Sequence, residues 1–481
     1  MLWMLAAILI CGASVFTACS SNDDNPFQPV VQVGIDKTNF PDDNFWNYLL
    51  EQDYGKDGVL TEAEIRNITV MDVSEKEIKS LKGIEYFTAL RTLNCSDNEL
   101  TELDISGNTA LDTLDCSYNE LTALDVSKNT ELDSLDCSVN ELTALDVSKN
   151  TALRSLDCGF NELTALDVSK NTALRSLDCG FNELTALDIS KNTALTYLRC
   201  IGNSLTSLDL SKNTALTYLQ CYGDDLTALD ISQNTALTVL HCGSNELTSL
   251  DLSVNKALTE LSCDDNKLTS LDISVNKALT ELSCSGNKLT SLDVSKNTAL
   301  TYLSCYDNKL TSLDISVNTA LTSLSCDGNK LTALDISKNT ALIHLYCGFN
   351  ELTSLDISKN TALTYLYCCF NELTSLDLSK NMALEKLLCF KNQISGQNMD
   401  ALIGSLRQNE SEEFCAFYVM DGNEPNQNVC TKSQAAAAKA KGWLPKYWDE
   451  DEKAWLEYEG SEPIHSRTDP NVYEKYIEQI E

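Results

Sequence analysis

The sequence predicts a β-rich solenoid of short 21-residue coils, with two short strands per coil, a small helical N-terminal cap and a mixed α/β C-terminal cap. Three observations predict this fold. A pattern of leucine, cysteine and asparagine repeats every 21 residues between Leu90 and Ile394. Each half of the pattern alternates apolar residues, as short strands do, and is too short for a stable helix with its connections. No proline lies between Asp42 and Glu424, as uninterrupted strand ladders require.

The composition of the 481 residues excludes several function classes. Thirty-five Lys and Arg against 71 Asp and Glu give a net charge of −36, which disfavours nucleic acid and anionic lipid as partners because both need a basic face. The chain has 3 His and lacks phosphate-loop, HExxH, GxSxG and GxGxxG motifs, so we do not expect an enzyme. A hydrophobic fraction of 43% indicates an ordered chain.

Residues 1–18 are interpreted as a lipoprotein signal peptide. Their apolar run is shorter than the roughly 20 residues that span a bilayer, and it fits the apolar region of a secretory signal. The run ends at Cys19 in a sequence that resembles a bacterial lipobox, so Cys19 is the expected lipidation site. An exported protein, lipid-anchored to the bacterial outer membrane and facing outward, is therefore expected, with residues 19–40 as its tether. No Lys or Arg precedes the run, which departs from the usual signal pattern, and the alternative is an uncleaved anchor or a plain signal peptide.

Residues 41–67 are expected to form a helical cap with an EF-hand-like loop. A helix over 44–52 enters a 12-residue segment that fits a calcium loop, with Gly58 at the turn. Gly55 stands where a ligand side chain is usual, so a single calcium ion would bind weakly. The alternative is a cap whose acidic residues bind no metal, and the sequence leaves both open. The candidate calcium ligands are Asp53, Asp57, Val59, Thr61 and Glu64.

Residues 68–394 are expected to form the solenoid. A degenerate first unit is followed by fourteen full units, L-x-x-L-x-C-x-x-N-x-L-T-x-L-D-(I/V/L)-S-x-N-x-x, and by one half unit. Burying about six side chains per coil contributes roughly 1.5–3 kcal/mol each, whereas ordering the backbone costs roughly 1–2 kcal/mol per residue. A lone coil is therefore unstable, and stacked neighbours must complete its core. At a strand spacing of ~4.8 Å, the coils would make a rod of about 70 Å.

This pattern resembles the 21-residue bacterial leucine-rich repeat, a class found in surface lipoproteins and internalin-like adhesins. The resemblance covers about 330 of the 481 residues. It implies a leucine-rich-repeat solenoid and a non-enzymatic adhesion or binding protein at the cell surface, whose partner is a macromolecule, in the first place a protein. The alternative is a cell-envelope structural module or a glycan-binding module.

One cysteine and two asparagines recur in each unit. The fifteen cysteines from Cys95 to Cys389 each follow an inward leucine by two residues, so we expect buried, free thiols. Disulfides between coils and a bound metal are less favoured, because parallel side chains hold the Cβ atoms apart and a straight ladder offers no tetrahedral cluster. A bridge between Cys415 and Cys430 is left open. The asparagine amides are expected to pair with one another and with turn backbone.

The outward residues of the two half-units differ in their variability. The second half carries 14 nearly invariant aspartates, Asp104 to Asp377, expected to bond to turns in solvent, with a cation-binding rail as the alternative. The first half varies and gathers aromatic residues, which offer large contact area at low entropy cost and favour recognition over free drift after duplication. The candidate partner-binding residues are Tyr197, Arg199, Tyr218, Tyr222, His241, Tyr302, Tyr306, His344, Tyr346, Phe349, Tyr365, Tyr367 and Phe370.

Residues 395–458 are expected to form the C-terminal cap, which would shield the open end of the core. Helices are predicted over 399–406 and 433–441, and strands over 414–420, 444–448 and 454–458, the last two as a hairpin. Trp443, Trp448 and Trp455 are expected to pack the core of the cap, with a glycan platform as the alternative. Residues 459–481 are interpreted as an acidic tail.

Overall fold

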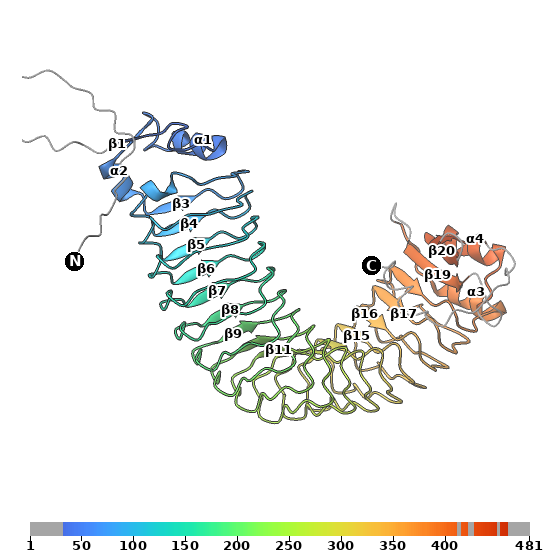
Figure 1. The fold of residues 1–481 in the computed structure, drawn as a ribbon. Helices are drawn as coiled ribbons and strands as arrows, with labels where there is room; N and C mark the ends of the chain where they lie inside the picture. The colour runs from blue at the N-terminus through green and yellow to red at the C-terminus, as the bar shows by residue number, and fades with distance from the viewer. Residues whose placement is uncertain (1–31, 411–414, 422–427, 450–452, 460–481) are drawn as a thin grey trace, which may run out of the picture.

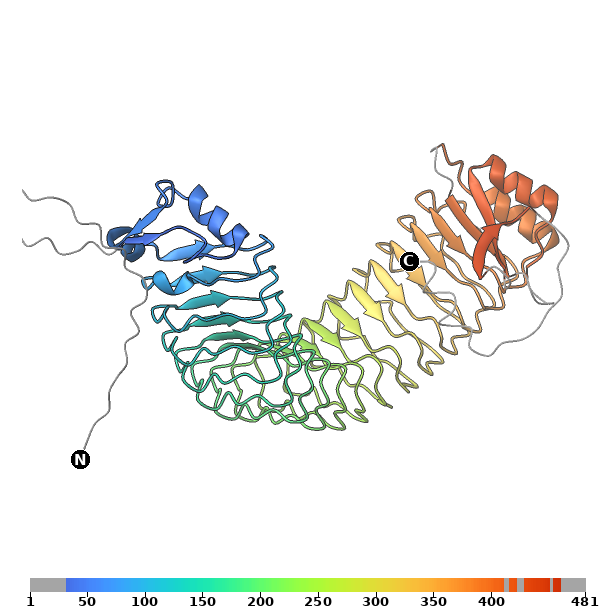
Figure 2. The ribbon, with the colours of Figure 1, turned by 45° about the horizontal axis from the view of Figure 1, so that its top comes forward.

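The computed structural model describes residues 32–410, 415–421, 428–449 and 453–459. The signal peptide, Cys19, most of the tether and residues 460–481 of the tail lie outside the described residues. Figures 1 and 2 show one continuous stack of coils with a small cap at each end. The stack bends into an arc and is not the straight rod that strand spacing alone suggested. No helix within the described ranges is long and apolar enough to cross a membrane.

Each coil contributes one three-residue strand, formed by the first half of the repeat. Neighbouring strands pair in parallel and in register, so that Leu93 lies opposite Leu114. The central leucine is buried and the two flanking residues face outward. The strands are β3 (Val70–Asp72), β4 (Thr92–Asn94), β5 (Thr113–Asp115), β6 (Ser134–Asp136), β7 (Ser155–Asp157), β8 (Ser176–Asp178), β9 (Tyr197–Arg199), β10 (Tyr218–Gln220), β11 (Val239–His241), β12 (Glu260–Ser262), β13 (Glu281–Ser283), β14 (Tyr302–Ser304), β15 (Ser323–Ser325), β16 (His344–Tyr346), β17 (Tyr365–Tyr367) and β18 (Lys386–Leu388).

The second half of each coil forms no strand in the described residues, so the expectation of two strands per coil was wrong. Its polar groups bond locally: Asp104 Oδ1 accepts from the Ser106 amide at 3.0 Å, and the Asn108 amide donates to the Ile105 carbonyl at 3.0 Å. The invariant aspartates therefore act as turn acceptors in solvent, as expected. Because only one side of the stack has a backbone ladder, only that side is held at strand spacing, which permits the arc.

The inward residues form a continuous apolar spine. The ladder cysteines are fully buried and free, and Cys415 and Cys430 are unbridged as well. Burial raises the pKa of the Cys95 thiol far above its ordinary value, so the sulfur stays protonated. The cysteine thus packs as a small apolar side chain, as predicted.

Two asparagine ladders connect the coils through side-chain hydrogen bonds. In the first ladder, Asn119 Nδ2 donates to the carbonyls of Cys95, Cys116 and Ser117, while its Oδ1 accepts from the Leu100 amide at 3.0 Å. In the second, Nδ2 donates to two carbonyls of the preceding coil. In the described coils both ladders bond to backbone, and the expected pairing of one asparagine side chain with another is not observed.

The N-terminal cap contains the predicted entering helix. Asp42 caps it by accepting from the amides of Asn44 and Phe45, and the buried Phe45 and Leu49 pack it against the first coils. A short antiparallel pair joins the chain before this helix to the end of the loop that follows it. The cap elements are β1 (Gln32–Gly34), α1 (Asp43–Glu51), β2 (Val59–Thr61), α2 (Glu62–Asn67) and the 3₁₀ helix η1 (Ile84–Tyr86).

The C-terminal cap continues the strand ladder and then reverses it. β19 (Cys415–Asp421) and β20 (Trp443–Asp449) extend the parallel order, and β21 (Ala454–Glu457) pairs antiparallel with β20, which confirms the predicted hairpin. Trp443 and Trp448 are buried, as expected of residues that pack the core of the cap. The cap elements are α3 (Gly396–Ser405), β19 (Cys415–Asp421), α4 (Lys432–Ala440), β20 (Trp443–Asp449) and β21 (Ala454–Glu457).

Asp224 interrupts the first asparagine ladder. Its Oδ1 accepts from the amides of Asn203 and Leu205, as an asparagine oxygen does in the other coils. Its Oδ2 takes the place of the asparagine Nδ2, is buried and has no hydrogen-bond partner. An unpaired buried oxygen costs about 1–3 kcal/mol. Burial raises the pKa of Asp224 to about 6, and the neighbouring Asp225 adds to the rise.

We predict that Asp224→Asn stabilises the protein by about 1–3 kcal/mol at pH 7.5, because the amide restores the missing donor. The folded-state pKa of Asp224 lies above its unfolded value, so the contribution of this carboxyl to stability falls as pH rises from about 4 through about 6. The difference between the two proteins should therefore shrink toward pH 4. Thermal unfolding and amide hydrogen exchange at pH 4.5, 6 and 7.5 measure it, and a difference independent of pH would contradict this account.

Candidate partner-binding face

The strand face presents two outward side chains per strand and one residue in the turn that follows. That turn residue has a positive φ in all fifteen coils that carry a ladder cysteine. Glycine adopts this conformation without strain and occupies it in four coils, whereas other L-residues pay about 1–2 kcal/mol. Five coils nevertheless place an aromatic residue there. These are Tyr118, Phe160, Phe181, Phe349 and Phe370.

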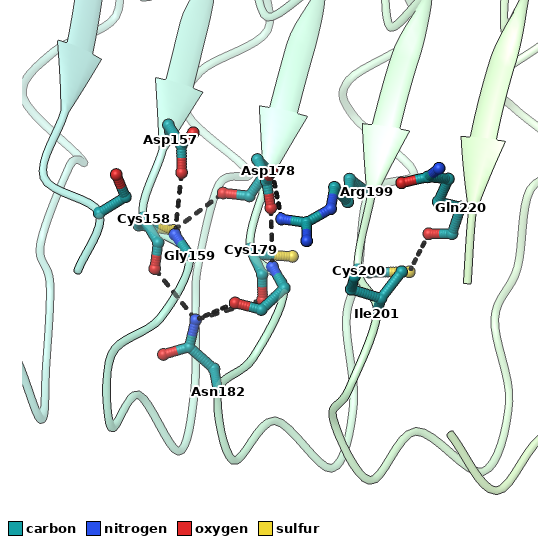
Figure 3. Close-up of polar contacts among 12 residues, drawn as sticks. Asp157, Cys158, Gly159, Asp178, Cys179, Asn182, Arg199, Cys200, Ile201 and Gln220 are labelled. Atoms are coloured by element: carbon teal, nitrogen blue, oxygen red, sulfur yellow. Dashed lines mark hydrogen bonds and ion pairs between the residues drawn. The ribbon is translucent and has the colours of Figure 1, made fainter. Parts of the chain in front are cut away.

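An acidic strip lies on β5 to β8 and ends at Arg199. Asp115, Asp136, Asp157 and Asp178 stand opposite one another in register, and Arg199 follows on β9. Figure 3 shows Arg199 reaching back to Asp178, with Nη1 at 2.8 Å from Oδ2. Burial, with a smaller effect from Asp178, raises the pKa of Asp157 to about 7. Asp157 is therefore only partly ionised near neutral pH.

Aromatic pairs cover the coils beside this strip. The rings of Phe160 and Phe181 stack at 4.3 Å, and the Arg199 guanidinium lies 5.4 Å from the Phe181 ring centre. The rings of Tyr197 and Tyr218 stack at 4.5 Å, nearly parallel. The structure thus places three sequence-predicted residues, Tyr197, Arg199 and Tyr218, beside the Phe160–Phe181 stack, whose two rings were not among the predicted site residues.

The middle of the face is a hollow of about 510 Å³ across β11 to β14. Four predicted residues, Tyr222, His241, Tyr302 and Tyr306, lie on its wall. Serine occupies the second outward position of β12, β13 and β14 on the floor of the hollow, whereas β11 carries the larger His241 at that position. The carboxylates that also line it, including those of Asp265 and Glu281, were not among the sequence-predicted site residues.

Another aromatic cluster adjoins the C-terminal cap. The ring centres of Tyr346 and Tyr365 lie 4.9 Å apart, and the rings of Phe349 and Phe370 stack with their centres 4.1 Å apart. Tyr367 was expected to face outward, but only 2% of it is exposed. It packs with Trp448 and Phe390 beneath the cap, so it presents no ring to a partner. His344 is exposed and meets the edge of Tyr365.

The acidic residues of the EF-hand-like loop do not converge in the described structure. Asp53 pairs with Lys56, and Asp57 Oδ1 accepts from the Val59 amide. Glu64 Oε2 accepts from the Thr61 amide and hydroxyl, both at 2.8 Å, and so completes a capping box for α2. Within the described ranges no three His, Cys, Asp or Glu side chains gather as metal ligands do. As folded, the loop serves as a helix cap, and ion binding would require Glu64 to turn away from Thr61.

Comparison with known proteins finds structural relatives. The chain is 33% identical to the functional domain of InlJ from Listeria monocytogenes, which includes a cysteine ladder, over 88% of this chain and 92% of that domain, with a TM-score of 0.68. A leucine-rich-repeat protein of Leptospira interrogans is 26% identical over 72% of this chain and 95% of its own, with a TM-score of 0.65. The Listeria internalin InlF, 23% identical over 74% and 96% with a TM-score of 0.52, shares the fold. No protein-family model and no curated sequence matches the chain.

We predict that Arg199→Gln destabilises the protein by about 1–3 kcal/mol at pH 8, since it leaves the half-buried Asp178 carboxylate without its cation. Because Arg199 lowers the pKa of Asp157, its loss raises that pKa further, and the destabilisation should shrink at pH 5, where Asp157 is protonated. Arg175→Gln removes an exposed arginine one coil earlier and is the control. Equal effects of the two changes on the thermal midpoint would contradict the prediction.

Proposed function

The chain belongs to the internalin-type leucine-rich-repeat proteins, and from this premise we propose that it is a non-enzymatic cell-surface protein that binds a protein partner through its strand face. The observation that carries the proposal is the set of exposed aromatic residues in left-handed turns. Phe160 is 47% exposed and Phe181 38%, although burial would stabilise both rings and glycine would suit both backbones better. Local strain at an exposed site supports a role in recognition.

The fold gives this face the rigidity that recognition needs. Side chains on a strand ladder are held in register by the backbone, so a partner meets them with little loss of conformational freedom. Aromatic and arginine side chains are the residues that most often dominate binding energy at protein interfaces. The Phe160–Phe181 stack beside Arg199 has this composition and is the proposed centre of the contact.

We propose that Cys19 carries a lipid that anchors the protein to the outer membrane, with the solenoid facing outward. The support is the lipobox-like sequence and the polar tether behind it. Membrane association would then depend on the lipid alone, because the net charge of −36 opposes adsorption to anionic lipid. Nucleic acid is disfavoured as a partner for the same reason.

A glycan-binding or structural role is the second candidate. It rested on the tryptophans of the C-terminal cap, but Trp443 and Trp448 are buried and Trp455 packs against Phe390 and Trp448. The exposed aromatic residues of the strand face therefore support a protein partner better than the cap supports a glycan.

We further propose that the loop from Asp53 to Glu64 takes one calcium ion weakly, at ~10⁻⁴–10⁻³ M, as extracellular modules do. The acidic residues at the first, fifth and twelfth loop positions and the turn at Gly58 support this proposal. The loss of a ligand at Gly55 and the present bonds of Glu64 account for the low affinity.

We predict that Phe160→Gly/Phe181→Gly weakens binding to the natural partner at least tenfold while unfolding stability changes by less than about 1 kcal/mol. Relief of left-handed strain (about 1–2 kcal/mol per residue) offsets the lost ring contacts and the added chain entropy. Binding is measured with the full chain on extracellular-matrix and bacterial-surface extracts, before and after protease and periodate treatment.

The matched control is Val254→Ser/Val317→Ser, which removes exposed apolar side chains from the turn side of the solenoid. The control should bind normally. Binding that resists protease and disappears with periodate would favour the glycan-binding alternative. Unchanged binding of the phenylalanine variant to every ligand found would remove this face from consideration.

For the loop, we predict that titration calorimetry of the full chain shows heat at millimolar calcium and that Glu64→Gln abolishes it. Glutamine preserves the capping box but removes the charge, so α2 should remain folded. Circular dichroism checks this. The absence of heat in the natural chain would leave the loop as a cap without an ion.

A further inference from the structure

The hollow across β11 to β14 combines aromatic walls with negative charge. Tyr302 is 39% exposed and Tyr222 37%, and both lie on its lining. Among the residues that line it are four carboxylates and no lysine or arginine. They are Glu260, Asp264, Asp265 and Glu281.

The structure holds two of these carboxylates in fixed positions. Asp264 accepts from the hydroxyls of Ser262 and Ser283, at 2.7 and 2.6 Å, on the floor of the hollow. Glu260 Oε1 lies 2.6 Å from His241 Nε2, and His241 Nδ1 lies 2.8 Å from Gln220 Nε2. A chain of side-chain contacts thus orients Glu260 before any ligand arrives.

No lysine or arginine of the described residues pairs with the carboxylates of the hollow. Glu260 and Glu281 stand opposite each other on paired strands, where like charges repel. In the described part of the chain, Asp264, Asp265 and Glu281 form no ion pair with lysine, arginine or histidine. Burial, together with the charges of Asp264 and Asp307, raises the pKa of Asp265. Burial raises the pKa of Tyr306 to about 12, and Asp265 adds to this.

We propose that this hollow receives a lysine or arginine side chain from a basic segment of the protein partner. The proposal rests on the function proposed above and adds the chemistry of the partner. A cation is attracted by the ring face of tyrosine and by unpaired carboxylates in the same place. A neutral sugar can donate hydroxyl hydrogen bonds to carboxylates but leaves their negative charge uncompensated, and an anionic sugar would be repelled. Charge complementarity therefore selects a basic peptide over a glycan.

The hollow also explains how the face achieves selectivity. The acidic strip is already neutralised in part by Arg199, so it attracts a basic partner less strongly than the hollow does. A partner that places its basic segment over β11 to β14 can at the same time contact the Phe160–Phe181 stack or the Tyr346–Tyr365 pair on either side. The hollow would thus set the position of the partner along the solenoid.

The test is fluorescence anisotropy of the full chain with a labelled seven-residue peptide of alternating glycine and lysine or arginine. Asp265→Asn/Glu281→Gln is expected to weaken binding at least tenfold. Asp251→Asn/Asp272→Asn removes the same charge from the exposed turn side of the same coils, where asparagine still accepts from the turn amide, and should bind as the natural chain does. Tyr302→Ser keeps the charge and should weaken binding about threefold.

The inference would be overturned if the two double variants lost affinity equally, or if Asp265→Asn/Glu281→Gln lost none. Unchanged peptide binding by Tyr302→Ser would overturn it too. Displacement of the peptide by a neutral oligosaccharide would overturn it as well. The peptide requires no natural partner, so this result is independent of the phenylalanine variant. If the peptide experiment contradicts the inference while the phenylalanine variant still loses partner binding, the proposed function stands and only the basic segment of the partner is ruled out.

Discussion

The structure depends on hydrogen bonds that asparagine side chains make between one coil and the next. A short coil has too few backbone bonds of its own, and its single strand pairs only three residues with each neighbour. The first asparagine supplies donors to three carbonyls and an acceptor to one amide, and so satisfies backbone polar groups that would otherwise be buried without partners. The leucines and cysteines fill the interior between the coils that these bonds align. The buried carboxylate of Asp224 shows what the ladder requires, because it alone lacks the donor.

The turn between each strand and the asparagine of the first ladder also carries a residue that varies from coil to coil. Each asparagine of the first ladder follows a residue in left-handed conformation, and that residue points away from the core, where its identity is not restricted by packing. Glycine, serine, aspartate, lysine, valine and aromatic residues all occur there. The scaffold therefore tolerates variation at a regular series of exposed positions. The aromatic clusters and the acidic hollow are two products of that tolerance on one rigid ladder.

The repeat predicted most of the fold, because leucine spacing, thiol position and the absence of proline all bear on one coil that recurs. The cap helices and the hairpin followed from local pattern as well. The presence of only one strand per coil could not be predicted in this way. The alternating pattern from Leu103 to Ile105 is the same whether the backbone groups of the second half pair with a neighbouring coil or with the Asp104 side chain. The burial of Tyr367 depends on a cap that folds back over it, which its own repeat position does not reveal. The hollow depends on the sizes of side chains in four successive coils.

The uniformity of the contacts between coils has an evolutionary consequence. Residues 151–171 and 172–192 differ at one position, valine in the first and isoleucine in the second. Each of these units bonds to its neighbours through the same atoms at closely similar distances. Unequal recombination between such segments inserts or deletes a whole coil without breaking either ladder. The molecule can lengthen or shorten its reach in discrete steps across generations, and each step shifts the spacing of its aromatic clusters while the fold is preserved.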